Sequence, residues 1–135
     1  MSTPSRRKGL SPHENHLKGL VGEGRFISYA ATQGWEVFRS LEGHSSCDFV
    51  IIDADRILWR VEVKCCRSLQ RNQGNQWATI VTKFDLDRFD YIFVSTEAGD
   101  YLIPAADCPK HTLAIRQENV SGRPAKYDKY LVVAA

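Results

Sequence analysis

The chain has 135 residues, of which 43% are hydrophobic and 25% are charged, and its formal net charge is +2. This composition fits one globular domain with a single core, and it excludes a disordered chain and a chain of two separate domains. No apolar run in the sequence approaches the length of a membrane span, so we expect no membrane association.

Charge is unevenly distributed along the chain. Residues 1–26 contain five Lys or Arg and two acids, and residues 56–83 contain six Lys or Arg and one acid. Residues 84–107 contain six acids and one Arg. Separate basic and acidic segments suit a surface that binds a polyanion such as DNA. The alternative is that these charges are solvated and cancel across the fold.

The cysteines indicate whether the protein resides in a reducing or an oxidising compartment. There are four: Cys47, Cys65, Cys66 and Cys108. None forms a C-x-x-C pair and no paired histidines accompany them, so their spacing does not indicate a zinc site. Cys65 and Cys66 are adjacent on a predicted strand and would point to opposite faces, which does not suit a disulfide. We therefore predict reduced thiols and a cytoplasmic protein.

The first predicted elements are a flexible basic arm over residues 1–10 and a helix over residues 12–33. Ser11 and Glu14 form a capping box at the start of this helix, and Gly34 is typical of the residue that follows a helix. Apolar residues at helical spacing form one stripe, which we expect to be the buried face of the helix. The members of the stripe are Leu17, Leu20, Val21, Ile27 and Ala31.

Short strands follow the helix, predicted by apolar or alternating segments between turn residues. They cover residues 35–39, 48–53, 57–65, 77–82, 91–95, 101–103 and, at an edge, 112–116. A polar stretch over residues 67–76 predicts a mobile loop, and residues 84–89 predict a short helix or turn. The order predicts one mixed α/β domain over residues 11–116, followed by a tail, residues 117–135, whose pattern predicts no structure.

The predicted strand over residues 57–65 carries a carboxylate and an ammonium on one face. Side chains alternate along a strand, so Glu62 and Lys64 point to one side while Val61 and Val63 point to the core. The valines would hold the strand rigidly, as a precise site requires. The alternative for this Glu-x-Lys pair is a solvated strand face.

Asp48 starts the preceding strand, and the hairpin register decides whether it meets Glu62. Asp48 pairs with Glu62 only if Asp53 pairs with Ile57, which leaves a three-residue loop over residues 54–56. A two-residue loop would place Asp48 on the opposite face. We predict the three-residue loop, which brings both carboxylates within reach of one cation.

Asp48, Glu62 and the main-chain carbonyl of Val63 supply oxygen ligands of the kind that Mg²⁺ prefers, and we expect Mn²⁺ to substitute. Phosphodiester hydrolysis needs a polarised phosphoryl oxygen, an activated water and a neutralised leaving oxygen, all of which such an ion provides. Lys64 is placed to orient or deprotonate that water, or to stabilise charge on the phosphorane. Glu23, at the margin of the helical stripe, is a further candidate that would hold a water on the metal or a second metal. The alternatives are a chance spacing and, for Glu23, an ordinary surface residue.

The order of these motifs resembles the PD-(D/E)XK nuclease superfamily. Within it, the chain is most similar to archaeal-type Holliday junction resolvases and to small intron-encoded homing endonucleases. Two departures are Cys47, where a proline is usual, and the lack of a long amphipathic helix after Lys64, which a resolvase is expected to have. The residues that carry the resemblance are Lys18-Gly19-Leu20-Val21-Gly22-Glu23, Gly34-Trp35-Glu36-Val37-Phe38-Arg39-Ser40, Gly43-His44-Ser45-Ser46-Cys47-Asp48 and Val61-Glu62-Val63-Lys64.

The resemblance implies a single restriction-endonuclease-like α/β domain, with an N-terminal helix packed on a mixed central sheet. It also implies Glu23, Asp48, Glu62 and Lys64 as the catalytic set, with Mg²⁺ at Asp48 and Glu62. It places Arg39 and the loop His44-Ser45-Ser46 against the DNA backbone. Charge and position suggest further DNA contacts, and Lys18 and Arg25 would lie on the outer helix face, where a solvated role is the alternative. These further candidates are Arg6, Arg7, Lys8, Lys18, Arg25, Arg67 and Arg71.

The expected function is a divalent-metal-dependent DNA endonuclease similar to a Holliday junction resolvase. The alternatives are a site-specific duplex endonuclease of the homing or restriction type, a catalytically silent DNA-binding module on the same fold, and a protein-interaction domain. One active site per chain and two strands to cut predict a homodimer or a higher symmetric oligomer.

Overall fold

The structure, a computed structural model, describes residues 11–42, 47–66, 70–71, 77–116 and 126–134. Its first element is helix α1, Pro12–Thr32, which confirms the helix predicted from the sequence. The Ser11 hydroxyl accepts a hydrogen bond from the Glu14 main-chain N–H at 3.1 Å and caps the first turn. Gly34, with a φ of 76°, allows the chain to reverse after the last turn.

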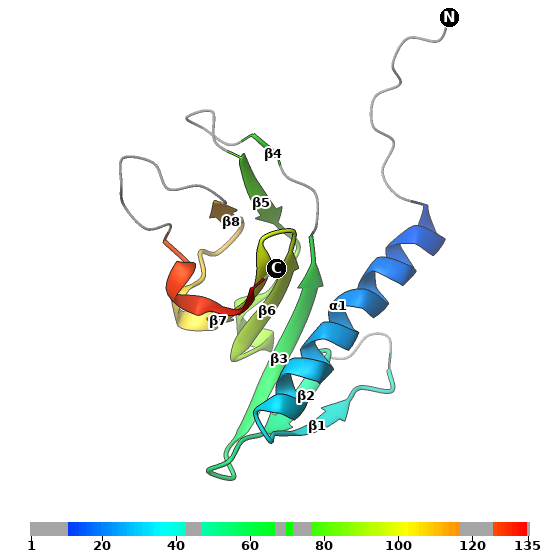
Figure 1. Cartoon of the computed structure of the whole chain (residues 1–135), viewed down its shortest axis with the longest axis vertical. Helices are drawn as coiled ribbons and strands as arrows, with labels where there is room; N and C mark the ends of the chain where they lie inside the picture. The colour runs from blue at the N-terminus through cyan, green and yellow to red at the C-terminus, as the bar shows by residue number, and fades with distance from the viewer. Residues whose placement is uncertain (1–10, 43–46, 67–69, 72–76, 117–125, 135) are drawn as a thin grey trace, which may run out of the picture.

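Strands of both directions form a six-stranded central sheet, in the order β1-β2-β3-β6-β7-β9 (Figure 1). The pairing of β3 with β6 is parallel and the other pairings are antiparallel, so the sheet is mixed, as predicted. Its strands are β1 (Glu36–Arg39), β2 (Phe49–Ile52), β3 (Leu58–Cys65), β6 (Tyr91–Thr96), β7 (Gly99–Pro104) and β9 (Leu131–Ala134).

A second sheet has three short strands in the order β4-β5-β8. They are β4 (Gln70–Arg71), β5 (Trp77–Val81) and β8 (Leu113–Arg116), and single 3₁₀ turns form at η1 (Leu86–Arg88), η2 (Ala105–Asp107) and η3 (Asp128–Tyr130). The predicted loop over residues 67–76 thus contains a strand, β4. The segment expected at a sheet edge, β8, pairs with β5 rather than with the central sheet.

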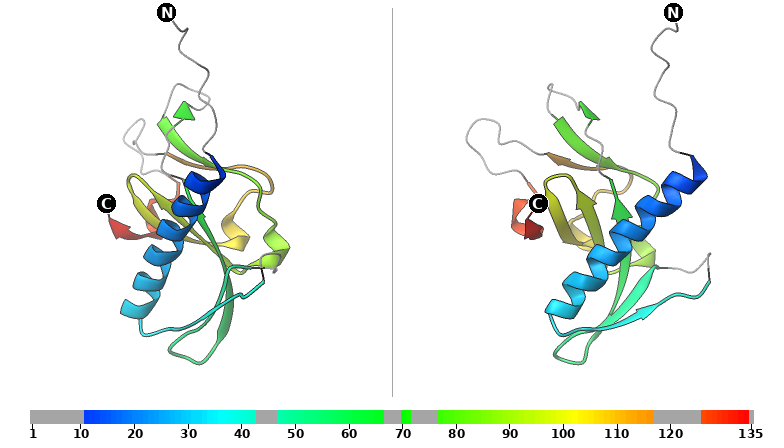
Figure 2. Two further views of the ribbon diagram at one scale, coloured as in Figure 1. Left: turned by 90° about the vertical axis from the view of Figure 1, so that its right-hand side faces the viewer. Right: turned by 45° about the vertical axis from the view of Figure 1, so that its right-hand side comes forward.

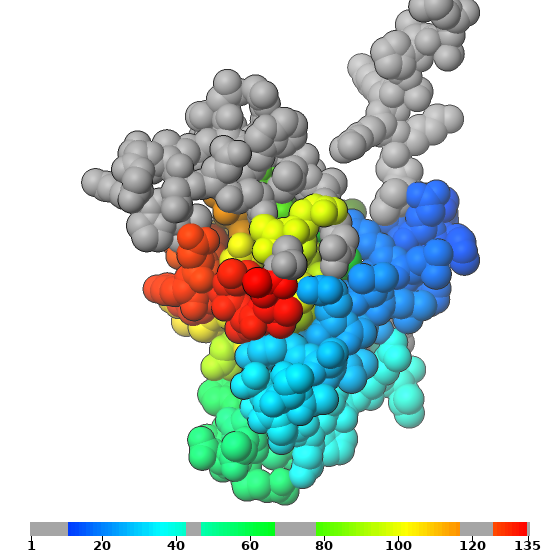
Figure 3. All heavy atoms as spheres, viewed as in Figure 1, coloured from blue at the N-terminus to red at the C-terminus, as the bar shows by residue number. Residues whose placement is uncertain are grey.

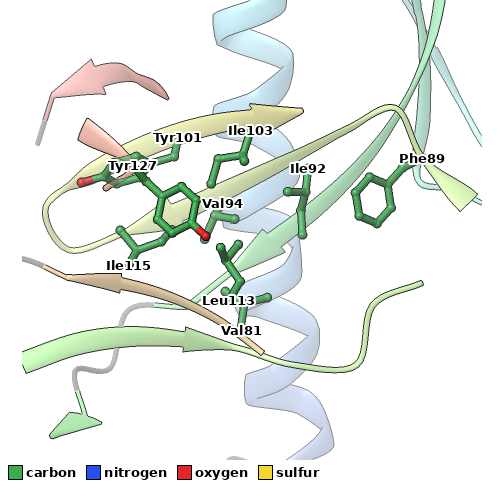
Figure 4. Packing of buried hydrophobic residues seen from close by; sticks show 9 residues of the cluster. All are labelled: Val81, Phe89, Ile92, Val94, Tyr101, Ile103, Leu113, Ile115 and Tyr127. Atoms are coloured by element: carbon green, nitrogen blue, oxygen red, sulfur yellow. The ribbon is translucent and has the colours of Figure 1, made fainter. Parts of the chain in front are cut away.

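Two hydrophobic cores lie on opposite faces of the central sheet, where the composition predicted a single core. On one face the Phe26 ring of α1 packs 5.2 Å from the rings of Phe49 and Phe93. On the other face, Val81, Leu113 and Ile115 of the small sheet point toward residues of β6 and β7 (Figure 4). Alternation along β6 explains the division, because Phe93 faces α1 while its neighbours, Ile92 and Val94, face the small sheet.

The buried face of α1 is not the predicted apolar stripe. The buried helix residues are Gly22, Phe26 and Ala30, spaced four apart. Gly22 lets the helix approach β3 closely, since a Cβ there would lie 2.9 Å from the Cys65 Cβ. The predicted stripe is instead exposed on the outer side of α1, which lies at the molecular surface (Figure 3). Its large members, Leu17, Leu20, Val21 and Ile27, are between 40% and 49% exposed.

The prediction that Lys18 and Arg25 lie on the outer helix face is wrong for the same reason. Lys18 is half-buried and is one helical turn before Gly22. Arg25 contacts Asp100 of β7, with its Nε 2.8 Å from Oδ2 and its Nη2 2.7 Å from the same oxygen. Asp100 is only 1% exposed, so the guanidinium neutralises a buried carboxylate.

The C-terminal segment contributes to the domain. Strand β9 pairs antiparallel with β7 at the edge of the central sheet, and Tyr127 belongs to the core beneath the small sheet. The four cysteines are free thiols, as predicted. Within the described residues, no helix has the length and apolar character needed to cross a membrane.

Candidate active site

The β2–β3 hairpin has the register that the sequence predicts. Phe49 pairs with Val61, and the Asp53 N–H donates to the Ile57 carbonyl at 3.0 Å, which leaves residues 54–56 as the loop. Arg56 closes this loop with a φ of 66°. The same register places Asp48, one residue before β2, opposite Glu62 of β3.

The carboxyl groups of Asp48 and Glu62 are in contact. Asp48 Oδ2 accepts a hydrogen bond from the Val63 main-chain N–H at 2.8 Å, which fixes the direction of the side chain. Burial raises the pKa of Glu62 to about 7, and the charge of Asp48 and a hydrogen bond between the two carboxyl groups add to this rise. Lys64 and Arg88 oppose it. Two carboxylates held together without a shared cation repel each other, so the pair is suited to bind one.

Lys64 lies beside the carboxylate pair and is tied to a distant segment. Its ammonium Nζ is 3.8 Å from Glu62 Oε1 and donates a hydrogen bond to the main-chain carbonyl of Lys83 at 3.2 Å. The Lys64 side chain is 26% exposed, so the charge is partly shielded from water but still accessible. As predicted, Glu62 and Lys64 lie on the face opposite Val61, which packs under α1.

A cavity of about 720 Å³ opens at this pair. Its walls come from α1, from the end of β1 and from the segment around η1. Figure 2 (left) shows α1 and η1 on opposite sides of the central strands. The cavity is therefore lined by elements that are distant in the sequence. The lining residues are Glu23, Arg39, Ser40, Leu41, Glu42, Asp48, Glu62, Lys83, Phe84, Asp85 and Arg88.

Glu23 and Arg39 meet on one wall of the cavity. The Glu23 carboxylate accepts a hydrogen bond and forms an ion pair with the Arg39 guanidinium. The Glu23 side chain is 26% exposed and that of Arg39 is 53% exposed, so both remain accessible from the cavity. The structure therefore brings Glu23 to the cavity of Asp48 and Glu62, as the sequence predicts, but with its charge already balanced.

The side chains present fit a hard divalent cation with two protein carboxylates. Within the part of the chain that the structure describes, no three His, Cys, Asp or Glu side chains cluster closely enough to enclose a metal. The third ligand would be the Val63 carbonyl. Because the N–H and C=O of one strand residue point to the same side, this carbonyl faces Asp48 as the Val63 N–H does. Such an open set leaves positions for waters, as Mg²⁺ prefers.

Several predicted DNA contacts fall outside the described residues: Arg6, Arg7, Lys8, His44, Ser45, Ser46 and Arg67. Arg71 lies on β4, and only its main chain is described. The cavity is also lined by residues for which the sequence predicted no site role: Glu42, Lys83, Asp85 and Arg88. The signal for Lys83, Asp85 and Arg88 was a charged segment at a predicted short helix, which is too common to indicate a site.

Comparison with known proteins gives a structural likeness but no sequence relative. The chain matches no protein-family model and no curated protein. Among solved structures it is similar to the bacterial homing endonuclease I-Ssp6803I, with a TM-score of 0.66 and 21% sequence identity over 86% of each chain. The chain therefore has the fold of that endonuclease, a single α/β domain.

Proposed function

We propose that this protein is a divalent-metal-dependent DNA endonuclease that hydrolyses phosphodiester bonds at the Asp48–Glu62 pair. One observation carries the proposal: two carboxyl groups in contact, beside the Lys64 ammonium, at a cavity of about 720 Å³. The likeness to a homing endonuclease adds support from the fold.

In this proposal each side chain has a separate task. Asp48, Glu62 and the Val63 carbonyl hold Mg²⁺, or Mn²⁺ in its place, and the bound ion would polarise the phosphoryl oxygen and acidify a water. Lys64 orients that water or stabilises the negative charge that develops on the phosphorane. The Glu23–Arg39 pair borders the site, where Arg39 contacts the DNA backbone and Glu23 orders water near the ion.

Duplex DNA is the substrate that the likeness favours, because the similar structure is a homing endonuclease. The junction-resolvase alternative rests on the sequence motifs, and the region after Lys64 contains the small sheet in place of a long helix. We therefore propose cleavage of duplex DNA as the main activity and treat four-way junctions as the competing substrate.

The test is a cleavage assay with Mg²⁺ on linear duplex, plasmid and four-way junction DNA, repeated with a chelator. We expect cleavage that the chelator abolishes. Loss of one ligand removes several kcal/mol of charge stabilisation, so Asp48→Asn and Glu62→Gln should lower the rate at least roughly hundredfold. Unchanged cleavage in either variant would refute the site. Wild-type protein that binds DNA but never cuts it would indicate a DNA-binding module instead.

We also propose that the protein acts as a homodimer or a higher symmetric oligomer, because one chain offers one carboxylate pair and a duplex has two strands. The exposed apolar stripe of α1, which contains Leu17, Leu20, Val21 and Ile27, supports a helix-to-helix contact between copies. Gly24 lies at its centre, and a Cβ there would meet nothing within 4 Å. Two antiparallel copies centred on Gly24 would set Leu17 against Ala31 and Val21 against Ile27.

A further inference from the structure

The segment that leads from β5 into η1 has an unusual main-chain conformation at Lys83. Its φ of 60° lies in the left-handed region, which non-glycine residues rarely adopt. Among the described residues, only Arg56 shares this feature, and Arg56 closes the β2–β3 turn. Such a conformation is strained for a residue with a Cβ and tends to occur at functional sites. Lys83 closes no hairpin, so its conformation calls for another explanation.

The surroundings of Lys83 hold the segment in place. Its carbonyl accepts the hydrogen bond from the Lys64 ammonium at 3.2 Å. The next residue, Phe84, packs against the core, with its ring 6.4 Å from that of Phe89. Farther along, Arg60 donates to the Asp87 carbonyl at 2.9 Å. The segment is thus a fixed wall of the cavity, anchored at several points.

The Lys83 ammonium differs from the other cations of the cavity. Arg39 is paired with Glu23, and Arg88 is paired with Asp85 at 3.5 Å. No hydrogen bond or ion pair engages the Lys83 ammonium within the described part of the chain. The cavity is lined by five acidic and three basic side chains, so a polyanion that enters it needs a cation that is not already neutralised.

We propose that Lys83 is a phosphate-binding residue, which holds a phosphate group of the DNA strand against the cavity wall opposite Glu23. The Lys83 carbonyl accepts the hydrogen bond from Lys64, and Lys83, an exposed residue, lines the cavity. The proposed ligand is a phosphate of the DNA backbone close to the phosphodiester that is cleaved at Asp48 and Glu62. This inference rests on the proposed endonuclease function.

The test compares Lys83→Gly with a matched control, Arg56→Gly. Glycine accepts a positive φ, so Lys83→Gly keeps the carbonyl in place for Lys64 and removes only the cation. Arg56→Gly likewise removes one cation from a left-handed position, but at the hairpin turn at the other end of β2, away from the cavity. Binding of a mixed-sequence 30-base-pair duplex is measured by fluorescence anisotropy across a salt series, in chelator to prevent cleavage.

Loss of one phosphate contact should reduce the salt slope by about 0.9 and the affinity roughly eightfold at 0.1 M salt. We expect this result for Lys83→Gly, recovery of most of the affinity in Lys83→Arg, and wild-type binding in Arg56→Gly. Circular dichroism melts confirm that the variants are folded. Equal affinity and slope for Lys83→Gly and the wild type would overturn the proposal, and so would an equal loss in Arg56→Gly.

A parallel cleavage assay separates this inference from the proposed function. Wild-type protein that cuts duplex DNA, together with normal binding by Lys83→Gly, would reject the Lys83 site alone. Wild-type protein that binds duplex DNA but does not cut it would reject the proposed endonuclease function. The binding comparison of Lys83→Gly with the wild type would still decide whether Lys83 binds phosphate. Failure of the wild type to bind the duplex at any salt concentration would reject both.

Discussion

Glu62 couples the stability of the fold to pH through its position beside Asp48. Its pKa rises from an ordinary value of 4.5 to about 7 in the folded chain, so the folded state binds a proton more tightly than the unfolded state between these values. The metal-free protein should therefore lose stability as pH rises from 4.5 through 7, and the loss from this group levels off about one pH unit above its folded pKa.

The measurement is a set of thermal melts from pH 5 to pH 8 in chelator and in Mg²⁺. Glu62→Gln should remove this part of the pH dependence, because the amide does not titrate. Mg²⁺ should raise the melting temperature more at pH 8 than at pH 6, since the metal displaces a proton at the lower pH. The same pH profile in Glu62→Gln and the wild type would show that this carboxyl does not have a raised pKa.

Arg25 has a structural role that a substitution can isolate. Arg25→Met leaves the Asp100 carboxylate, which is 1% exposed, without its partner. Breaking a buried pair costs roughly 3–5 kcal/mol, and we expect the lower end because Arg25 is 35% exposed. Denaturant unfolding measures the change.

The double variant is the control for this ion pair. Adding Asp100→Asn to Arg25→Met removes the unpaired charge and should restore part of the lost stability. If the double variant is less stable than Arg25→Met by the full effect of the single Asp100→Asn change, the two residues are not coupled. Whether Arg25 also contacts DNA stays a prediction.

At the scale of elements, the packing of α1 on β3 depends on Gly22. Gly22→Ala places a methyl group 2.9 Å from the Cys65 Cβ, so helix and strand must separate. Gly19→Ala is the matched control, since a Cβ there meets nothing within 4 Å. Alanine favours a helix by about 1 kcal/mol over glycine. We expect Gly19→Ala to stabilise the protein and Gly22→Ala to destabilise it in chemical unfolding, and two stabilising substitutions would contradict this packing.

The extent of α1 could be predicted from the sequence, but its buried face could not. Capping by Ser11 and the stop at Gly34 are local signals that tertiary contacts do not change. The buried face is set by a glycine contact and by one large ring, Phe26, neither of which forms a continuous hydrophobic pattern. Lys18 and Arg25 interrupt that face with charges, so the aliphatic row on the other side gave the stronger periodicity.

The hairpin of β2 and β3 was predictable for the opposite reason. Its register follows from the parity of one short loop, and a chemical requirement on Asp48 and Glu62 selected the parity. The small sheet could not be predicted, because β5 pairs with β8, more than thirty residues later. The segment that follows β5 supplies the cavity wall at Lys83 and Arg88. Local sequence patterns could not predict that this wall faces Asp48 and Glu62.

For the whole molecule, the exposed row on α1 makes a specific prediction about assembly. Val21→Glu puts a charge at a position that is 49% exposed in one chain and would be covered in a dimer. We expect sedimentation to give twice the 15.3 kDa chain mass for the wild type and the single mass for Val21→Glu. Leu131→Glu, at a residue 41% exposed on β9, is the control and should remain dimeric. A wild-type mass of one chain, with and without duplex DNA, would count against the dimer.

The loop over residues 54–56 has a consequence for how this chain can change over evolution. Among the described residues, those of this loop belong to neither core and do not line the cavity. A single inserted or deleted residue, however, would shift the register of β2 against β3 by one residue. Asp48 would then point to the sheet face opposite that of Glu62. Active relatives should therefore vary freely in the identity of these residues, while the length of the loop changes in steps of two.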